Sequence, residues 1–249
     1  MTFCKLIGSM TLATVMLSGA AYGEDAKETP KRGALEGFNR AMHGFNSGLD
    51  KWLLKPVTKG YKWITPDPVE RGVSNVFGNL REVINIPNDL LQGKFKQAAN
   101  DTGRLVVNST IGIGGIFEVA DSMGLKKSEG EDLGQTLASW GVPAGPYVVV
   151  PFLGPSTLRD FPAGVADGLA FDVVRHVDNV SLRNSLYGLR VVDTRSQLLS
   201  SEELISGDSY TFIKDAYLQR RDFLVKDGEV EDDFGDDYGD DYGSEGNDN

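Results

Sequence analysis

The sequence has one cysteine and two histidines in 249 residues, which excludes most chemistry that depends on a thiol or an imidazole. Cys4 lies in an N-terminal segment that we expect to be removed, so the mature protein would contain no disulfide and no thiolate nucleophile. His43 and His176 have no His or Cys neighbour at the spacing of metal ligands. The sequence therefore predicts no metal site, and it contains no motif for a cofactor.

Motifs of common enzymes are also missing. There is no Gly-x-Ser-x-Gly nucleophile elbow, and Gly112-x-Gly-Gly115 follows a predicted helix rather than the strand that a dinucleotide fingerprint requires. Gly207-Asp-Ser209 resembles the opening of some serine lipases, but its place before a predicted helix favours Asp208 or Ser209 as the helix cap. We therefore expect that the protein is not an enzyme. The alternative is a lipid hydrolase with Ser209 as its nucleophile.

Apolar runs long enough to cross a membrane are absent as well. The apolar stretch Leu6–Leu17 follows Lys5 and precedes the small residues of Ser18–Gly23. This is the layout of a secretory signal peptide over residues 1–23, and the stretch is too short for a confident membrane span. Residues 24–34 then form a flexible N-terminal segment of an exported protein. A retained N-terminal anchor is the alternative.

Negative charge is concentrated at the C-terminus. The net charge is −11, from 36 acidic and 25 basic residues, and residues 227–249 contain eleven of the acids and no Lys or Arg. The preceding body is balanced, with 25 residues of each sign, so nucleic acid is not an expected partner. The tail cannot bury enough apolar area to become ordered, and we expect it to be disordered. The alternative is a flexible arm in which Phe234, Tyr238 and Tyr242 contact a partner.

Apolar residues recur at steps of three and four through much of residues 35–226, which is the period of amphipathic helices. The first helix begins near Leu35 and should stop before Pro56, because proline disfavours helix at the residue before it. A helix that begins at Val69 should likewise break at Ile86-Pro87. Further helices are expected over residues 57–64, 95–106, 158–174, 180–199 and 208–226.

Glycine and proline are frequent between Ile111 and Asp160, and no regular helix can run through the prolines at positions 143 to 155. Within this insert, Tyr147–Phe152 has a β-rich composition and predicts an extended hairpin arm. The sequence thus predicts an all-α fold. It consists of a single helical domain over residues 35–226, an irregular Gly/Pro-rich hairpin insert and a disordered acidic tail over residues 227–249.

The aromatic residues allow two interpretations. Trp52, Trp63 and Trp140, together with eight tyrosines, are suited to a membrane interface, where the rings meet both an apolar and a hydrated phase. The same residues are common in soluble cores, and composition by itself favours that interpretation. Helices with an apolar stripe can also lie in the plane of a bilayer.

Many short blocks of sequence follow one another in a characteristic order along residues 35–226. They are Glu36–Arg40, Lys55-Pro56, Asn79-Leu80, Leu91–Gly93, Asn108–Gly115, Gln135–Leu137, Gly141, Gly145–Tyr147, Pro151–Pro155, Leu158–Asp160 and Tyr217–Arg220. In this order they resemble the MlaA (VacJ) family over nearly the whole body of the chain. Such a series of blocks is a more specific signal than any single motif above.

The resemblance implies a ring-like helical protein seated in the inner leaflet of a Gram-negative outer membrane, around an amphipathic conduit. Such proteins associate with trimeric porins, remove mislocalised phospholipids from the outer leaflet and pass them to a periplasmic lipid-shuttle protein. This intermembrane phospholipid transport maintains lipid asymmetry and implies no catalytic residue. The alternative is a porin-associated structural protein of the outer membrane without transport activity.

By the same analogy, the passage is expected at two segments rich in glycine and proline. Glycine there would permit close packing and hinge motion. The residues expected to line the lipid conduit are Asn108, Gly112, Gly114, Gly115, Phe117, Gly141, Gly145, Pro146, Tyr147 and Pro151.

The N-terminus departs from the family pattern. Many relatives are lipoproteins in which a cysteine, preceded by leucine and two small residues, is acylated. Leu17-Ser-Gly-Ala20 follows this pattern with Ala20 in place of the cysteine. We therefore expect a non-lipidated protein on the periplasmic side of the outer membrane, held there by its helices and its partner.

Overall fold

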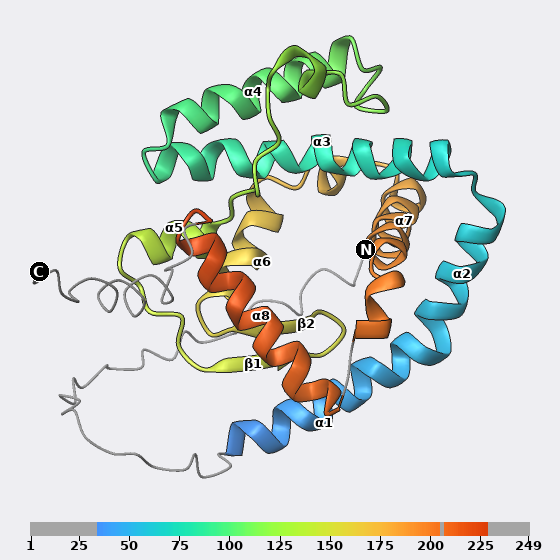
Figure 1. Cartoon of the computed structure of the whole chain (residues 1–249), viewed down its shortest axis with the longest axis vertical. Helices are drawn as coiled ribbons and strands as arrows, with labels where there is room; N and C mark the ends of the chain where they lie inside the picture. The colour runs from blue at the N-terminus through green and yellow to red at the C-terminus, as the bar shows by residue number, and fades with distance from the viewer. Residues whose placement is uncertain (1–33, 205–206, 229–249) are drawn as a thin grey trace, which may run out of the picture. The chain divides into compact units, whose positions relative to one another are not determined.

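The computed structural model describes residues 34–204 and 207–228, which Figure 1 shows as ribbon. The predicted signal peptide, Ala20, residues 24–33 and residues 229–249 of the predicted tail lie outside the described residues. The chain divides after Gly33 into two units, and every described element belongs to the second unit, which begins at Ala34.

Helices make up nearly all of the regular structure, which confirms the predicted all-α fold class. The α-helices are α1 (Ala34–Leu49), α2 (Lys55–Ile64), α3 (Asp67–Leu91), α4 (Phe95–Thr110), α5 (Leu133–Ser139), α6 (Asp160–Ala170), α7 (Val180–Gln197) and α8 (Ser209–Val225). Shorter helical turns are η1 (Asp50–Leu54), η2 (Ala120–Met123), η3 (Val173–His176) and η4 (Ser200–Leu204). In the described ranges, β1 (Tyr147–Val150) and β2 (Gly154–Thr157) form a single two-stranded antiparallel sheet.

The first helix does not stop before Pro56, so that prediction was wrong. Helical backbone continues from Ala34 to Ile64 through α1, the π-helical turn η1 and α2 (Figure 1). In η1 the backbone N–H of Lys55 donates to Asp50 O, five residues earlier. Pro56 therefore sits where regular helical bonding restarts, and its missing N–H is tolerated there.

The third predicted helix also runs further than expected, because α3 passes through Pro87 without a break. Pro87 has no N–H to donate to Val83 O, a loss that usually ends or kinks a helix. In this region α3 buries the polar side chains of Asn85, Asn88 and Asp89, and it packs against α4 (Figure 1). Tertiary contacts therefore outweigh the local cost of the proline.

The predicted hairpin is present within the insert. Tyr147 pairs with Thr157 and Val150 pairs with Gly154. The rest of the insert is more regular than predicted, because it contains α5. Asp132 caps that helix, and its side chain accepts a hydrogen bond from a backbone N–H in the first turn at 2.9 Å.

Contacts between elements close into a circuit within this unit (Figure 1). α1 contacts β1, the hairpin continues to β2, β2 contacts α6, and α6 contacts α5. α5 contacts α3, α3 contacts α7, α7 contacts α2, and α2 joins α1 through η1. This circuit agrees with the ring-like arrangement that the family resemblance implies.

Burial is reversed relative to an ordinary soluble domain. Among the described residues, seventeen polar or charged side chains are buried, against six apolar ones. Large apolar side chains lie on the surface instead, and Trp52, Trp63 and Trp140 are 81%, 87% and 57% exposed. Both features are unusual enough to carry information about function. The interpretation of these tryptophans as core residues is therefore wrong, although no helix in the described ranges is both long and apolar enough to span a bilayer.

Candidate functional site

A polar cavity of about 680 Å³ lies between α3, α6, α7, α8 and the connection over residues 127–132. On α3, Ser74, Gly78, Arg81 and Asn85 line the cavity, and their spacing of four, three and four residues places them on one face of the helix. Cavities of about 300–1,000 Å³ are typical of sites that hold small molecules. The cavity is large enough for a ligand of that class.

Arg221 of α8 holds two carboxylates at the cavity wall. Its guanidinium donates to Asp132 at 2.6 and 3.1 Å and to Asp160 at 3.1 Å, and Arg159 donates to Asp160 at 2.8 Å. Burial by itself raises the pKa of both acids, but Arg221, joined by Arg159 at Asp160, lowers both pKa values below their ordinary range. Gly134 packs against this cluster, because a Cβ there would lie 2.6 Å from Asp160 Oδ1. The charges therefore compensate one another and join α5, α6 and α8.

Acids near α6 and α7 are also held by donors. Asp172 accepts from Arg190 at 2.7 Å, and Asp193 accepts from a serine hydroxyl of α3 at 2.6 Å. Asp167 accepts from the backbone N–H that opens α5 at 2.7 Å. Burial raises the pKa of Asp167 and Asp193 despite these hydrogen bonds. The cavity wall thus combines many polar groups with the apolar side chains of Phe77, Leu80 and Ile84, and its acidic groups are individually satisfied.

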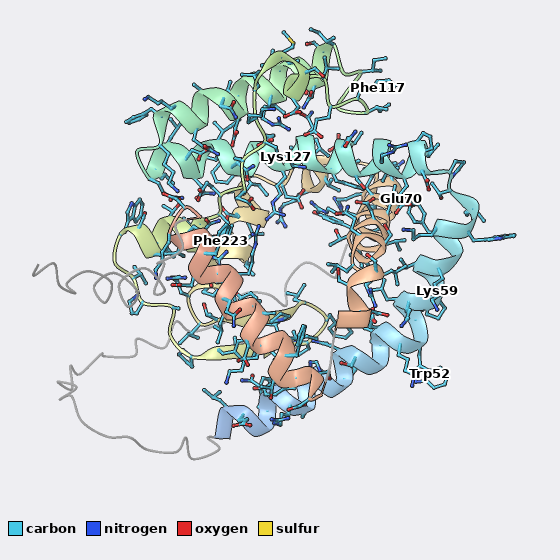
Figure 2. All side chains as sticks on the ribbon, viewed as in Figure 1. Trp52, Lys59, Glu70, Phe117, Lys127 and Phe223 are labelled. Atoms are coloured by element: carbon cyan, nitrogen blue, oxygen red, sulfur yellow. The ribbon has the colours of Figure 1, made fainter. Side chains whose placement is uncertain are left out.

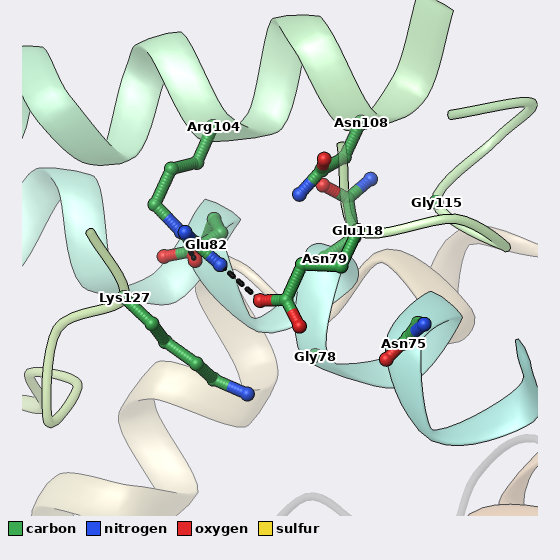
Figure 3. Close-up of a pocket in the computed structure, with 9 residues that line it drawn as sticks. All are labelled: Asn75, Gly78, Asn79, Glu82, Arg104, Asn108, Gly115, Glu118 and Lys127. Atoms are coloured by element: carbon green, nitrogen blue, oxygen red, sulfur yellow. Dashed lines mark hydrogen bonds and ion pairs between the residues drawn. The ribbon is translucent and has the colours of Figure 1, made fainter. Parts of the chain in front are cut away.

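A second polar network joins α3 to α4 (Figure 3). Arg104 of α4 is buried, and it donates to Glu82 at 3.3 Å, to Leu125 O at 2.7 Å and to Glu118. Burial, followed by the charge of Asp101, raises the pKa of Glu82. The network surrounds a space of only about 10 Å³, which is close to the volume that one water molecule needs. This network is structural, because it leaves no room for a larger ligand.

Asp89 of α3 is the least compensated acid of the buried interior. Its side chain is fully buried, and neither carboxylate oxygen has a hydrogen-bond partner among the described residues. Burial, followed by the charges of Asp101 and Glu131, raises its pKa to about 7, while Lys94 acts in the opposite direction. A large fraction of Asp89 is therefore protonated at neutral pH.

The first group of predicted conduit residues forms the turn after α4. Asn108 is buried, and its Oδ1 accepts a hydrogen bond from a backbone N–H of η2 at 2.9 Å. Gly115, with a φ of 90°, packs against α3, and a Cβ on Gly112 would lie 2.2 Å from Phe117 O. Gly114 and Phe117 are exposed. Close backbone packing therefore explains the glycines at positions 112 and 115.

The second group leads into the hairpin. Gly141 and Gly145 have φ values of 85° and 68°, a backbone region that favours glycine. Pro146 O accepts a backbone hydrogen bond from the far end of the hairpin at 3.1 Å. Tyr147 begins β1 and its ring contacts two tyrosine rings of α8, and Pro151 lies exposed in the hairpin turn. These residues shape the hairpin and its attachment.

Neither group lines the large cavity, so their assignment to a lipid conduit remains a prediction. Asn108 and Gly115 do line the small space in Figure 3, which shares four lining residues with the large cavity, including Gly78 and Lys127. The first group is therefore adjacent to the large cavity, and in the second group Tyr147 contacts Tyr217, which lines the cavity.

The cavity-lining residues of α3 were not predicted from the sequence, although a signal for them existed. Ser74, Gly78, Arg81 and Asn85 recur with helical spacing, as an apolar stripe would, but they are polar or small. Such a polar stripe is usually taken for the solvated face of a helix. Here it lines a partly open cavity formed with α6, α7 and α8.

The structure brings Ser209 next to a histidine that is distant in sequence. Ser209 Oγ lies 3.1 Å from His43 Nε2, and Ser47 Oγ lies 3.3 Å from the same nitrogen. Burial lowers the pKa of His43. Among the described residues no carboxylate is hydrogen-bonded to the imidazole, and neither Ser209 nor His43 lines one of the cavities described above. The pair lacks the orienting acid and the substrate pocket of a serine hydrolase. Asp208, as predicted, caps α8.

Potential metal ligands do not cluster in the described part of the chain. Within residues 34–204 and 207–228, no group of three or more His, Cys, Asp or Glu side chains is placed to hold a metal ion. The acids around the cavity are instead committed to arginines and neutral donors.

A protein-family model described as MlaA lipoprotein matches residues 31–224. The chain is 36% identical over 231 residues to the intermembrane phospholipid transport system lipoprotein MlaA of Escherichia coli (strain K12), with 90% of each chain covered. It is 32% identical over 231 residues to the protein of the same name from Haemophilus influenzae, with 91% of this chain and 92% of the relative covered.

The fold is similar to that of a solved protein chain as well. The superposition has a TM-score of 0.68 with 34% sequence identity, and it covers 77% of this chain and 98% of the other. That structure was described under the heading "Structural basis for maintenance of bacterial outer membrane lipid asymmetry". The match includes nearly all of the solved chain.

Proposed function

Since this chain belongs to the MlaA lipoprotein family, we propose that it transports phospholipids between membranes. In this proposal it removes mislocalised phospholipids from the outer leaflet of the outer membrane and transfers them toward a periplasmic carrier, which maintains lipid asymmetry. Support comes from relatives of nearly equal length that are named for intermembrane phospholipid transport.

A cavity with many polar side chains, combined with an apolar exterior, is the main support for this proposal. A phospholipid has a polar headgroup and apolar acyl chains, so a carrier must offer each part a matching environment. Charged and amide side chains line much of the cavity of about 680 Å³ and suit a headgroup, while Phe77, Leu80 and Ile84 line another part of it. The acyl chains would stay against the apolar exterior and the surrounding lipid, where burial of apolar surface is favourable by about 25 cal/mol per Å².

The outer surface of α1, η1 and α2 supports a seat in the membrane. Trp52, Leu53, Trp63 and Ile64 are 58–87% exposed on this continuous helical segment. In Figure 2 the side chain of Trp52 points away from the rest of the protein. Exposed tryptophans are suited to the interface between headgroups and acyl chains. We propose that these helices lie in the plane of the inner leaflet.

The two segments predicted as conduit remain part of the proposal. The turn over residues 108–117 lies next to the large cavity through shared lining residues, and it exposes Ile113 and Phe117. The hairpin turn exposes Phe152 and Leu153, each 71%. Such apolar loop ends would meet lipid or a trimeric porin, and a periplasmic shuttle protein would collect the phospholipid. The alternative is a structural protein bound to the porin without transport.

We propose that the protein acts without catalysis. The Ser209–His43 pair is the one arrangement in the described residues that resembles a catalytic dyad, and it lacks an acid partner and a pocket. Passage of a lipid requires a path and a partner, and it breaks no covalent bond.

A block placed inside the cavity tests the transport proposal. Gly168 of α6 lines the cavity, and a Cβ there would meet nothing within 4 Å, so Gly168→Trp adds a large side chain to the cavity wall at a position with open space around it. Gly188→Trp on α7 is the matched control, because Gly188 has equally open surroundings and does not line the cavity. Each variant is returned to cells that lack the gene, and phospholipid in the outer leaflet is measured.

If the transport proposal is correct, the wild-type chain and the G188W control restore lipid asymmetry. The G168W variant, present at the same protein level, does not restore it. If the G168W variant restores asymmetry as well as wild type, the cavity is not the path. If wild type also leaves the outer leaflet unchanged while it copurifies with a porin, the structural alternative is supported instead.

A further inference from the structure

Acidic side chains outnumber basic ones in the cavity lining, yet two of the basic ones have no acidic partner among the described residues. Its lining includes eight acids, and each of them accepts a hydrogen bond or ion pair from a described residue. Arg190 and Arg221 in the lining are committed to such acids. Arg81 and Lys127 also line the cavity, and within residues 34–204 and 207–228 neither forms an ion pair or a side-chain hydrogen bond. Two uncompensated positive charges therefore face the cavity.

The two cations lie on one section of the wall. Lys127 Nζ is 4.0 Å from the position that a Cβ on Gly78 would take, so the ammonium group lies beside that turn of α3 (Figure 3). Arg81 follows Gly78 by three residues, and positions three apart on a helix are neighbours, with about 5–6 Å between their Cβ atoms. Arg81 Nε is 3.9 Å from the position of a Cβ on Gly130. The ammonium and guanidinium groups thus both occupy the space between α3 and residues 127–130.

Glycine stands at two positions beside this space. A side chain at position 78 would meet the ammonium group, and one at position 130 would lie 3.4 Å from Asn85 Oδ1 and near the guanidinium. Asn85 itself is committed, because its Oδ1 accepts from the N–H of Glu131 and its amide donates to Glu82. On this part of the wall, Arg81 and Lys127 have donors without a partner among the described residues.

We propose that Arg81 and Lys127 together bind the phosphate group of a phospholipid headgroup inside the cavity. A guanidinium offers paired N–H donors that match two phosphate oxygens, and an ammonium adds a compact charge. The acids close to the two cations in sequence, Glu82, Glu129 and Glu131, are each ion-paired with another basic residue, which reduces their repulsion of a phosphodiester. This inference rests on the proposed transport function for the source of the phosphate, while the phosphate chemistry itself rests on the two cations.

Binding to the purified full-length chain tests the inference. The probes are dihexanoyl-phosphatidylglycerol below its micelle concentration, dihexanoylglycerol without a phosphate, glycerophosphoglycerol without acyl chains, and inorganic phosphate. The test variant carries Arg81→Gln and Lys127→Gln. The matched control carries Arg71→Gln and Lys59→Gln, which remove the same charges from exposed positions outside the cavity.

We expect the test variant to bind dihexanoyl-phosphatidylglycerol at least tenfold more weakly than wild type, and the control variant to bind within twofold. A variant with Arg81→Lys and Lys127→Arg should retain most of the binding. Because both cations are exposed and unpaired among the described residues, the test variant should keep the thermal midpoint of wild type, which separates lost binding from lost folding.

Equal binding by the test variant and wild type would overturn the proposal, and so would equal binding of dihexanoylglycerol and the phospholipid. Competition by glycerophosphoglycerol or inorganic phosphate as strong as that of the phospholipid would assign the site to free phosphates and overturn the headgroup assignment. Cellular asymmetry is measured separately. If wild type fails there, the transport proposal fails while the binding result stands. If wild type restores lipid asymmetry but phospholipid binding does not depend on Arg81 and Lys127, only the phosphate-binding inference fails.

Discussion

The backbone N–H of Val149 donates a 2.8 Å hydrogen bond to Asn39 Oδ1, which joins the middle of β1 to α1. The Asn39 amide completes the pair, because Nδ2 donates to Tyr147 O at 2.9 Å. One side chain thus satisfies two groups of β1 that a neighbouring strand would otherwise bond. Asn46 repeats the arrangement about two helical turns later, with Val150 O and Phe152 N as its partners.

Replacement of Asn39 by leucine should therefore detach the hairpin. The N39L variant leaves one N–H and one C=O of β1 unsatisfied at a buried position, which costs about 2–4 kcal/mol. We expect the midpoint of thermal unfolding to fall by roughly 5–10 °C. The N46L variant should cost less, because its partner Phe152 is 71% exposed and water can replace the lost bond. Equal midpoints for N39L and wild type would show that the hairpin needs no such support.

Gly134 should tolerate no side chain. A Cβ at this position would lie 2.6 Å from Asp160 Oδ1 and 2.7 Å from Arg221 Nη2, so Gly134→Ala must displace the ion pair. Overpacking of this kind costs about 1–3 kcal/mol, and the urea midpoint should fall accordingly. Gly164→Ala on α6 is the control, because its Cβ meets open space and alanine favours helix. A G134A variant as stable as the G164A variant would contradict the observed packing.

The stability gained by Asp89→Asn should depend on pH. The pKa of Asp89 is about 7 in the folded chain, against an ordinary value of 3.8. The folded state therefore holds its proton more tightly than the unfolded state. The stability that comes from the neutral carboxyl is fully present below the ordinary pKa and is lost as pH rises through the folded value. The amide of the variant stays neutral at every pH, so D89N should exceed wild type in thermal midpoint at about pH 8 by more than it does at about pH 5.

Asp121→Asn is the control for this comparison, because Asp121 is exposed at the surface. Its difference from wild type should be the same at both pH values. A difference for the D89N variant that does not change between the two pH values would show that Asp89 is charged throughout.

The exposed tryptophans should control membrane binding and leave folding unchanged. Trp52 and Trp63 are 81% and 87% exposed, so replacement of both by glutamate removes few contacts within the chain. We expect the double variant to float with phosphatidylcholine vesicles several-fold less than wild type, because glutamate is costly in the acyl region. Lys59→Glu on the same segment changes the charge by the same two units and should float normally. Equal flotation of all three proteins would place the membrane contact elsewhere.

The Ser209–His43 contact should have no catalytic role. Ser209→Ala removes the hydroxyl that lies 3.1 Å from His43 Nε2, and Ser47→Ala removes the hydroxyl that lies 3.3 Å from the same atom. We expect neither variant to alter the release of fatty acid from phospholipid vesicles, which should stay at the buffer level for wild type too. A measurable release that only S209A abolishes would revive the hydrolase interpretation.

Local sequence patterns predicted the helices and the hairpin well, and they failed at the two prolines. Pro56 and Pro87 predict helix ends, because each lacks an N–H and restricts the residue before it. At Pro56 a π-helical turn accommodates the missing N–H, and at Pro87 the packing of α3 against α4 compensates for the lost hydrogen bond. The residues next to each proline do not indicate this compensation, so a local sequence pattern could not predict it.

The candidate site was predictable only in part. The glycines at 112 and 115, predicted as conduit residues, lie outside the cavity; they pack closely against Phe117 O and α3, and their place in a conduit stays a prediction. The polar face of α3 carried no such signal, since polar residues at helical spacing are ordinary on a solvated surface. Arg81 and Lys127 are 46 residues apart in sequence, and only the folded chain places both in one cavity.

The sequence by itself determined the helical fold class, the hairpin within the insert, the cap of α8 and the family, because each depends on residue types at short spacing or on their order along the chain. The tertiary structure alone decided which face of each helix is inside. Burial arises from contacts between distant segments, and here those contacts enclose the polar faces and leave Trp52 and Trp63 outside. An amphipathic pattern identifies two faces of a helix, and only the neighbours and the surrounding phase decide which face is covered.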